Sequence, residues 1–427
     1  MIKFGTAGIR EENLSKETVA KVVQAICETL PKRSKILVGR DTRESGEELC
    51  ETAIQVLFEN DMDVFYIERP IAISLVSSEI KNDGGYKAGL YFSASHNPAQ
   101  YNGIKIFNSK GRQIDKVLCQ KIEEIVNSKD YPPLEDDAYG YNSLNAEKIE
   151  NDYIYKLGGQ YNNKVKLLYN CGYGTGRTVI PKIIKNIEII EATDRDILTT
   201  DCDSKLINPE NLEATNFDCL HVVVATDPDC DRIAVCEYGK YINGHDMTAL
   251  LLDYLMQRYP EVKGQCKICK SKVTSLLAEK IAEYNGIDVV NTNVGFNNIS
   301  KYVDDDDFLL GAEESCGYLM TSFTNDKCGI SSLLVISEMI DYWDSLGIKL
   351  NDRLSRLKES YLNINECTSS ETTTLNKLLD KLKDKYVFLS QLNGTVKLVD
   401  INNGNIVYIR QSGTEKNKCK VYFKTCN

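Results

Sequence analysis

The strongest constraint on the fold is the alternation of short apolar runs with helical patterns along most of the chain. The apolar run Lys35–Gly39 precedes a helical pattern that reaches Phe58, and a second run, Asp63–Glu68, follows it. Another helical pattern, Ser15–Leu30, comes first and has a serine at its N-cap position. This alternation predicts layered α/β domains built on parallel or mixed sheets.

The same alternation returns in two later parts of the chain. One part begins with the strand pattern Val165–Tyr169 and closes with Ile233–Glu237. A polar stretch from about Asn127 to Asn145 precedes it and is typical of a linker. The next part begins near Asn243, and its expected elements are Met247–Gln257, Lys267–Lys272, Ser275–Asn285, Asp288–Asn291 and Ser331–Trp343.

The last part, from about Leu350, has a different pattern. Two helical patterns, Leu350–Tyr361 and Leu375–Tyr386, precede three strand patterns at 394–399, 405–410 and 418–424. This order predicts a small α+β module rather than a further α/β unit.

Length and charge limit the class of protein. The chain has 427 residues, which suggests two to four domains, and its 51 Lys and Arg against 62 Asp and Glu give a net charge of −11. An acidic balance argues against nucleic acid or anionic membrane as a partner. No signal-peptide pattern or long apolar run occurs, and fifteen scattered cysteines favour free thiols in a reducing compartment. We therefore expect a cytoplasmic protein.

A candidate nucleophile follows the strand pattern Ala88–Phe92. Ser95 is flanked by His96 and by Asn97-Pro98, a pair that cannot continue a helix or a strand. The end of a strand is where α/β sheets usually present their chemistry. Taken alone, this string fits an ordinary turn as well as a nucleophile.

Three carboxylates at alternate positions indicate a metal site. Asp227, Asp229 and Asp231 lie between two apolar strand patterns, and alternation brings them to one side of the backbone. A hard divalent cation relieves their repulsion, and Mg²⁺ fits because three protein oxygens leave room for water or a phosphate oxygen. The alternative is an acidic surface turn.

Two further segments suggest a ligand with a phosphate and hydroxyl groups. Arg410, Ser412, Gly413 and Thr414 combine a guanidinium, two hydroxyls and a glycine-freed backbone, which suits an anion nest or an ordinary hairpin. The segment 311–318 ends a strand with acidic and hydroxyl groups that suit a polyol, or a solvated strand end. Together these sites favour phosphoryl transfer between serine and a sugar phosphate.

The sequence resembles the α-D-phosphohexomutases, the phosphoglucomutase/phosphomannomutase superfamily, over nearly its whole length. The motifs that carry the resemblance are FGTAGIR at 4–10, VGRDTRESG at 38–46, SASHNPAQYNGIK at 93–105, DPDCDR at 227–232, AEESCGY at 312–318 and RQSGTE at 410–415. The resemblance implies an α/β chain of four domains, three similar α/β domains with mixed sheets and a smaller C-terminal α+β domain, around a central cleft. The implied boundaries are 1–145 for the phosphoserine domain, 146–242 for the metal-binding domain, 243–348 for the sugar-binding domain and 349–427 for the phosphate-binding domain.

The resemblance also implies roles for individual residues. Ser95 would be carried as phosphoserine, and its phosphate would share Mg²⁺ with the three aspartates. The residues expected around that phosphate and after the metal loop are Arg10, His96, Lys105 and Arg232, and Lys327 looks similar to a proposed general acid or base. The residues expected to hold the sugar and its other phosphate are Gly295, Glu313, Ser315, Arg410, Ser412, Gly413 and Thr414.

The implied reaction interconverts hexose 1-phosphate and hexose 6-phosphate, with a hexose 1,6-bisphosphate as intermediate and activator. Glucose is the first choice of sugar, and mannose, glucosamine and pentose are alternatives. A regulator that binds sugar phosphates and a phosphatase are further alternatives, and the protein is expected as a monomer or homodimer. The chain departs from the family pattern at Glu11, Tyr318, Cys328 and Gln411 and lacks a closing helix, which bears on its rate.

Overall fold

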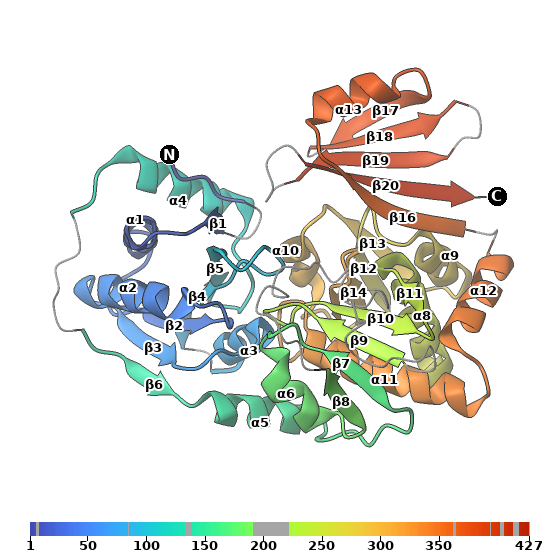
Figure 1. Cartoon of the computed structure of the whole chain (residues 1–427), viewed down its shortest axis with the longest axis horizontal. Coiled ribbons are helices and arrows are strands. Elements are labelled where there is room, and N and C mark those ends of the chain that lie inside the picture. Colours follow the sequence, from blue (N-terminus) through green and yellow to red (C-terminus); the bar gives the residue numbers. More distant parts are fainter. Residues whose placement is uncertain are drawn as a thin grey trace. The chain divides into compact units, whose positions relative to one another are not determined.

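The computed structural model describes residues 1–5, 8–83, 85–132, 139–190, 222–361, 364–392, 394–401, 405–412 and 418–426. The chain divides into two compact units, one of Met1–Tyr241 with Gly317–Glu338 and the other of Ile242–Cys316 with Met339–Asn427. Its described strands form four sheets with helices between them (Figure 1). The predicted mixed α/β fold with several sheets is confirmed, and the four domain boundaries stay a prediction.

The first sheet has six strands in the order β1-β5-β4-β2-β3-β6. The central strand β2 pairs in parallel with β3 and β4, whereas β5 pairs antiparallel with β4 and β1, so the sheet is mixed. The strands are β1 (Ile9–Glu12), β2 (Lys35–Arg40), β3 (Asp63–Ile67), β4 (Tyr86–Phe92), β5 (Tyr101–Asn108) and β6 (Asn142–Leu144).

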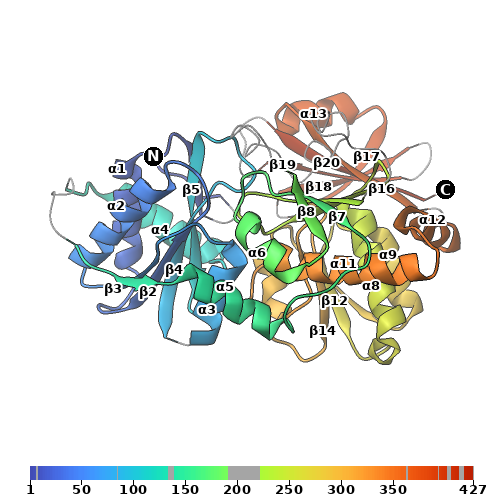
Figure 2. The ribbon, with the colours of Figure 1, turned by 60° about the horizontal axis from the view of Figure 1, so that its bottom comes forward.

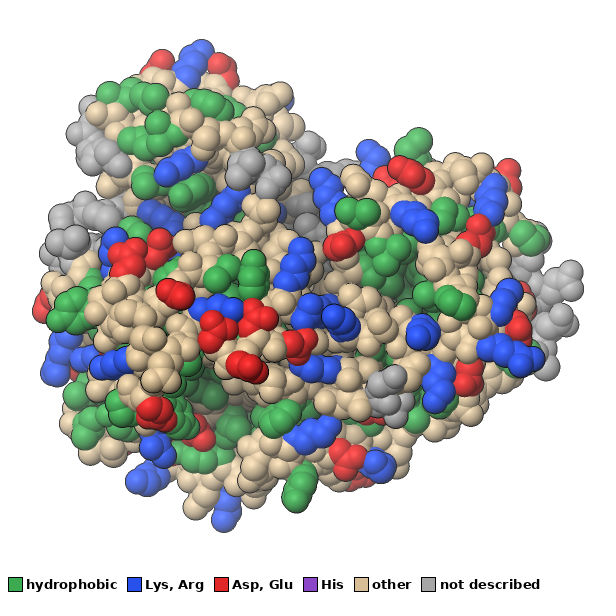
Figure 3. Space-filling view, turned by 180° about the vertical axis from the view of Figure 1, so that it is seen from behind, with side chains coloured by type: hydrophobic (Ala, Val, Ile, Leu, Met, Phe, Trp, Pro, Cys, Tyr) green, Lys and Arg blue, Asp and Glu red, His purple; other side chains and the backbone are tan. Residues whose placement is uncertain are grey.

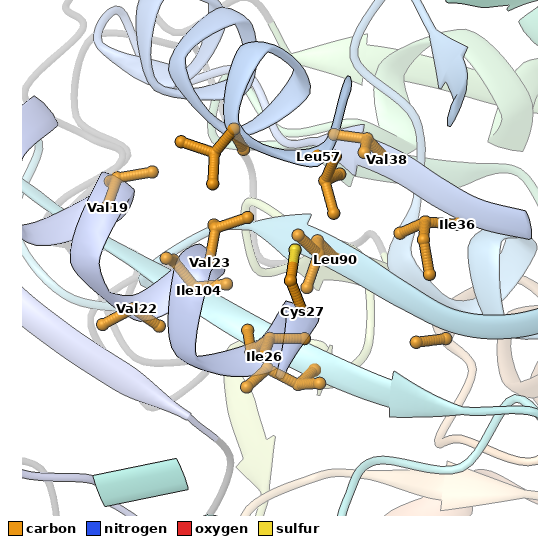
Figure 4. Packing of buried hydrophobic residues seen from close by; sticks show 14 of the residues in the cluster. Val19, Val22, Val23, Ile26, Cys27, Ile36, Val38, Leu57, Leu90 and Ile104 are labelled. Atoms are coloured by element: carbon orange, nitrogen blue, oxygen red, sulfur yellow. The ribbon is translucent and has the colours of Figure 1, made fainter. Parts of the chain in front are cut away.

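The two faces of this sheet are covered differently. Helices α1 (Lys16–Cys27), α2 (Gly46–Glu59) and α4 (Lys116–Ser128) cover one face, and apolar side chains of α1 and α2 meet those of β2, β4 and β5 there (Figure 4). Helix α3 (Ile73–Asp83) covers the other face. It approaches closely because Gly89 has no side chain, since a Cβ there would lie 2.4 Å from Cδ1 of Ile80.

The second sheet has the order β11-β10-β9-β7-β8. Its buried strands β9 (Val222–Thr226) and β10 (Ile233–Glu237) pair antiparallel and are joined by a short turn. The remaining strands are β7 (Leu167–Asn170), β8 (Ile187–Ile190) and β11 (Lys240–Ile242), with helices α5 (Ala146–Lys156) and α6 (Gly176–Ile183). Gly176 begins α6 in close contact with the sheet, since a Cβ there would lie 2.0 Å from the Tyr169 hydroxyl. Gly174 is also closely packed, since a Cβ there would lie 2.8 Å from Cα of Pro228.

The third and fourth sheets differ in strand direction. The third has the order β13-β12-β14-β15, and β12 pairs in parallel with β13 and β14. Its strands are β12 (Lys267–Ser271), β13 (Asp288–Thr292), β14 (Phe308–Ala312) and β15 (Tyr318–Leu319), and its helices are α8 (Gly244–Arg258), α9 (Leu276–Tyr284), α10 (Phe296–Ile299) and α11 (Gly329–Ser345). Helices α8 and α9 lie side by side (Figures 1 and 2).

The fourth sheet is antiparallel, with the order β16-β20-β19-β18-β17. Its strands are β16 (Ile364–Glu371), β17 (Tyr386–Leu392), β18 (Thr395–Asp400), β19 (Ile406–Gln411) and β20 (Cys419–Cys426). Helix α12 (Leu350–Ser360) precedes it and α13 (Leu375–Leu382) packs on it.

Some sequence expectations were wrong in this region and near the linker. The two edge strands β16 and β17 were missed, because β16 contains mostly polar residues and because the apolar start of β17 continues the helical pattern of α13. The stretch 311–318 does close a strand, as expected, because β14 ends at Ala312, and a turn with Cys316 at a φ of +65° then separates β14 from β15. The predicted linker also contributes β6 to the first sheet.

The surface carries charges of both signs. Figure 3 shows lysine and arginine side chains interspersed with aspartate and glutamate on the face that it presents, and the apolar side chains there form small separate groups. Among the described residues, no helix has the length and apolar character needed to cross a bilayer.

Candidate active site

Ser95 lies at the end of β4 in a strained conformation. Its backbone φ is +51°, in the left-handed region that costs an L-residue about 1 kcal/mol or more, and its side chain is 1% exposed. Residues 93–100, which connect β4 to β5, are called the Ser95 loop. Within this loop the Ser95 N–H donates to Oγ of Ser93 at 2.8 Å. The predicted strand-end turn is therefore present, and Ser95 is buried in it.

The acidic triad, Asp227, Asp229 and Asp231, occupies the turn between β9 and β10. All three side chains are buried, and one oxygen from each lies within 4.8 Å of the others. Oδ1 of Asp227 accepts from the N–H groups of Asp231 and Arg232 at 3.1 and 3.0 Å, while its Oδ2 lies 2.9 Å from Oγ of Ser95. The turn and the Ser95 loop therefore meet at one point of the same compact unit.

The donor set of the acidic triad fits a hard divalent cation. Three carboxylates supply oxygen ligands, the kind that such cations prefer. The Oδ1 atoms of Asp229 and Asp231 are buried and have no hydrogen-bond partner among the described residues. Because a buried acceptor without a partner is costly, both oxygens are free to take a cation as a ligand.

Three cationic side chains balance the charge of the acidic triad. Lys105 Nζ lies 2.6 Å from Oδ2 of Asp229 and 3.4 Å from Oδ2 of Asp231. Lys327 Nζ is also 3.4 Å from Oδ2 of Asp231, and Nε of Arg232 lies 3.6 to 3.7 Å from Asp231 and Asp227. The site therefore gathers charges of both signs in a buried space, as phosphoryl transfer requires.

The pKa values of Asp227 and Asp229 are driven apart by burial and by neighbouring charges. Burial and the adjacent Asp231 and Asp229 raise the pKa of Asp227 well above its usual range. Burial also raises the pKa of Asp229, but Lys105 outweighs it and the net pKa is below the usual value. Burial lowers the pKa of Lys105, and the attraction of Asp229 and Asp231 more than restores it, so Lys105 stays charged.

His96 belongs to the Ser95 loop, and Arg10 is bonded to this loop from β1. Arg10, on β1, donates from Nη1 to Oδ1 of Asn97 at 3.1 Å, and burial lowers the pKa of its guanidinium. Nδ1 of His96 lies 3.4 Å from Oγ of Ser95. The His96 ring is therefore next to the Ser95 hydroxyl, and Arg10 binds the same loop through Asn97.

Lys327 belongs to the compact unit that holds Ser95, although it lies more than 200 residues further along the chain. The segment before it is fastened to helix α3 and to the turn after β5. Thr324 Oγ1 and the Asn325 N–H donate to Oγ of Ser77 at 2.8 and 3.1 Å, and Lys81 donates to Oδ1 of Asn325 at 2.9 Å. These bonds set the position of Lys327 relative to the acidic triad.

Asp326 yields a prediction about pH. It accepts from Gln113 Nε2 at 2.6 Å, and burial together with Asp231 raises its pKa to about 6. A raised carboxyl pKa means that its contribution to stability is complete below about pH 4 and is lost as the pH rises through about 6. In metal-free buffer, Asp326→Asn should therefore be more stable relative to the parent at pH 8 than at pH 4.5, by about 2 kcal/mol. Denaturant unfolding at both pH values measures this, and an equal difference at both would contradict it.

The predicted sugar and phosphate residues lie in the second compact unit. Glu313, at the end of β14, accepts from the Gly295 N–H at 3.2 Å, so two of the three predicted sugar-facing residues are in contact, and Ser315 follows in the turn. Arg410 and Ser412 end β19 and begin its connection to β20, and Arg410 Nε donates to the Tyr422 hydroxyl at 2.9 Å. Gly413 and Thr414 lie outside the described residues.

Sequence reasoning missed three residues of the site. Arg43 donates to backbone carbonyls of the Ser95 loop, Ser93 lies 3.1 Å from Oδ2 of Asp229, and Asp326 lies beside Lys327. For Arg43 a signal was present, since Asp41 and Arg43 directly follow a buried apolar strand, where charged residues need partners. Ser93 and Asp326 had no comparable signal of their own.

The comparisons with protein families agree with this site. The family model described as phosphoglucomutase/phosphomannomutase, alpha/beta/alpha domain I, matches residues 1–132, which include the Ser95 loop. The model of domain III of the same family matches residues 243–361. Together the two models cover more than half of the chain.

Individual relatives point to the same family. A phosphoglucomutase of Staphylococcus haemolyticus is 26% identical over 433 residues, which span 90% of this chain and 78% of that protein. The solved parafusin of Paramecium, named as a phosphoglucomutase, has a TM-score of 0.79 at 17% identity over 100% of this chain and 90% of its own. A solved N-acetylphosphoglucosamine mutase of Aspergillus fumigatus, in complex with GlcNAc-6P and magnesium, has a TM-score of 0.60 at 13% identity over 100% of this chain and 92% of its own.

The solved structures share the fold, and the family models match the two parts of the sequence that carry the Ser95 loop and the Glu313 turn. Taken with the buried serine beside three aspartates and their cationic partners, these findings show that the chain belongs to the phosphoglucomutase/phosphomannomutase family of mutases.

Proposed function

We propose that this enzyme interconverts hexose 1-phosphate and hexose 6-phosphate, with glucose as its preferred sugar, through a phosphoserine at Ser95 and a hexose 1,6-bisphosphate. The observation that carries the proposal is the 2.9 Å contact between Oγ of Ser95 and the acidic triad, in a buried site lined by Lys105, Arg232 and Lys327. Glucose is chosen because the curated relatives of this chain are named phosphoglucomutases.

The residues of the first unit would hold the phosphoserine. Asp227, Asp229 and Asp231, with the oxygen on Ser95, would hold Mg²⁺, which when bound neutralises charge on the transferring phosphoryl group. Lys105 and Arg10 add positive charge beside it, and His96 donates from its ring to a phosphate oxygen. The strained φ of Ser95 keeps its Oγ at the triad rather than in a strand conformation.

The reaction consists of two phosphoryl transfers. In the first, the P–O bond to Ser95 breaks and a new bond forms to the free hydroxyl of the hexose phosphate, and Lys327 carries the proton of that hydroxyl to the departing Ser95 oxygen. The bisphosphate then turns end for end. In the second, the other phosphoryl group returns to Ser95 and Lys327 gives the proton back to the released hydroxyl.

The second unit would bind the rest of the substrate. Glu313, Ser315 and the backbone at Gly295 would accept the sugar hydroxyls, because their carboxylate and hydroxyl groups suit a polyol. The phosphate that is not transferred would be bound by Arg410, Ser412, Gly413 and Thr414. We further propose that domains 1–145, 146–242, 243–348 and 349–427 supply the phosphoserine, metal, sugar and phosphate sites respectively.

An assay with purified protein tests this function. With Mg²⁺, a trace of glucose 1,6-bisphosphate and glucose 1-phosphate, we expect glucose 6-phosphate to form faster than the products of the mannose, glucosamine and pentose 1-phosphates. EDTA should stop the reaction and excess Mg²⁺ should restore it, because the triad carboxylates need the cation. Release of inorganic phosphate without formation of the isomeric sugar phosphate would favour a phosphatase. If no sugar phosphate gave any product, the mutase proposal would be refuted and a regulator that binds sugar phosphates would be favoured.

A further inference from the structure

One arginine side chain binds several backbone carbonyls in and next to the Ser95 loop. Arg43 follows β2, and its side chain is fully buried. Its Nη2 donates to the carbonyl oxygens of Ser95 and Asn97 at 2.6 and 2.8 Å, and its Nη1 donates to those of Pro98 and Tyr101, both at 2.7 Å. The carbonyls of three residues of the Ser95 loop and of Tyr101, the first residue of β5, therefore converge on one guanidinium.

The fifth donor of Arg43 is also used. Its Nε donates to Oδ2 of Asp41 at 3.2 Å, and the Arg43 N–H donates to Oδ1 of the same carboxylate at 3.0 Å. A guanidinium has five N–H donors in a planar fork, and all five have partners here. No other side chain reproduces this pattern, because a lysine has three donors and no plane.

The backbone around Arg43 is joined to the same region. The Asp41 N–H donates to the Phe92 carbonyl at 3.0 Å, and Asn102 Nδ2 donates to Oγ of Ser45 at 2.9 Å. The connection between β2 and α2 therefore runs beside both ends of the Ser95 loop. Between these two bonds, Arg43 binds the carbonyl oxygen of Ser95, the residue with the positive φ.

We propose that Arg43 is a positioning residue that keeps Ser95 in its left-handed conformation and so aims Oγ at the acidic triad. Arg43 contacts neither Oγ nor the acidic triad by any hydrogen bond or ion pair that the described residues show, so it acts through the backbone. Without the guanidinium, four carbonyls lose the donors that it supplies, and Ser95 can relax to the extended φ that an L-residue prefers. The inference rests on the proposed role of Ser95.

Arg40 offers a matched control. It lies three residues before Arg43, is also mostly buried, and donates to Tyr66, Glu47 and the Glu68 carbonyl, each at 3.2 Å. None of these partners belongs to the Ser95 loop. Arg43→Lys and Arg40→Lys therefore both remove a buried guanidinium from the same connection, but only the first removes contacts to the loop.

The test compares these variants by kinetics and by hydrogen–deuterium exchange of the peptide covering residues 93–104. For Arg43→Lys we expect kcat to fall about 100-fold and KM for glucose 1-phosphate to stay within about threefold, because the chemistry is misaligned while no substrate contact is lost. The loop amides should exchange about tenfold faster or more. Arg40→Lys should change kcat by less than about threefold and leave loop exchange unaltered. Equal effects of the two variants on kcat and on exchange would overturn the proposal.

Two additions keep the test decisive. If Arg43→Lys does not fold, Asp41→Asn is the second variant. It retains the Arg43 guanidinium and one acceptor oxygen at position 41, but it removes the negative charge that orients the guanidinium. Asp41→Asn should raise the exchange rate of the loop amides and lower kcat about fivefold. Values equal to the parent would overturn the proposal. Loop exchange needs no substrate, so a parent protein without mutase activity would refute the proposed function while the exchange data still decide the role of Arg43.

Discussion

Replacement of Ser95 by alanine is expected to lower kcat by about 10⁴-fold or more, because it removes the only group proposed to carry the phosphoryl intermediate. The variant should also fail to take up phosphate from glucose 1,6-bisphosphate, which intact-protein mass spectrometry measures as a mass increase of the parent only. The Oγ of Ser95 contacts Asp227 in a fully buried site, so its loss leaves no second hydroxyl at the same place.

Ser93→Ala is the matched control for this prediction. Ser93 is two residues away, equally buried, and its Oγ contacts Asp229 at 3.1 Å and accepts the Ser95 N–H. Its removal costs hydrogen bonds but leaves the proposed carrier, so Ser93→Ala should still gain the phosphate and lose only about tenfold in kcat. If Ser95→Ala took up phosphate, or if only Ser93→Ala failed to take it up, Ser95 would not be the carrier.

The parts of this molecule that could be predicted from sequence are those set by neighbouring residues. The strand before Ser95, the turn that Asn97-Pro98 enforces and the alternate spacing of Asp227, Asp229 and Asp231 are local patterns. Local spacing also predicted that the three carboxylates share one side, and the structure places them within 4.8 Å. The strand and helix alternation of the first three sheets follows from apolar periodicity in the same way.

The parts that could not be predicted depend on contacts between distant segments. Arg43 meets carbonyls more than 50 residues away, and no periodicity encodes that meeting. The segment that carries Lys327 returns to the first compact unit through Ser77 and Lys81, although its neighbours in sequence belong to the second. The edge strand β16 escaped because a strand paired on one side needs few apolar residues, so its sequence resembles a loop.

Lys105→Met is expected to destabilise the metal-free protein by about 3–5 kcal/mol, because it leaves the buried carboxylate of Asp229 without its partner. Lys105 is 3% exposed and Asp229 is fully buried, so water cannot replace the lost ammonium group. The loss should be greater at pH 8 than at pH 5, since at lower pH the unpaired carboxyl group can take up a proton. Denaturant unfolding, followed through the transition of the first compact unit, measures the loss of stability and its dependence on pH. Lys105→Met/Asp229→Asn should recover most of the stability, because it removes the unpaired charge as well.

Mg²⁺ distinguishes an ion-pair role of Lys105 from a general packing role. In the metal-free protein the Lys105 ammonium group neutralises negative charge on Asp229 and Asp231. A cation bound by the acidic triad would neutralise the same carboxylates. A cation that binds only the folded protein raises its unfolding midpoint, and the rise grows with the logarithm of the ratio of cation concentration to Kd. Because Lys105→Met removes a competing positive charge, millimolar Mg²⁺ should raise the midpoint of this variant by several degrees more than that of the parent. An equal shift in both proteins would show that Lys105 and the cation do not share the carboxylates, and the absence of any shift would count against a metal site at the triad.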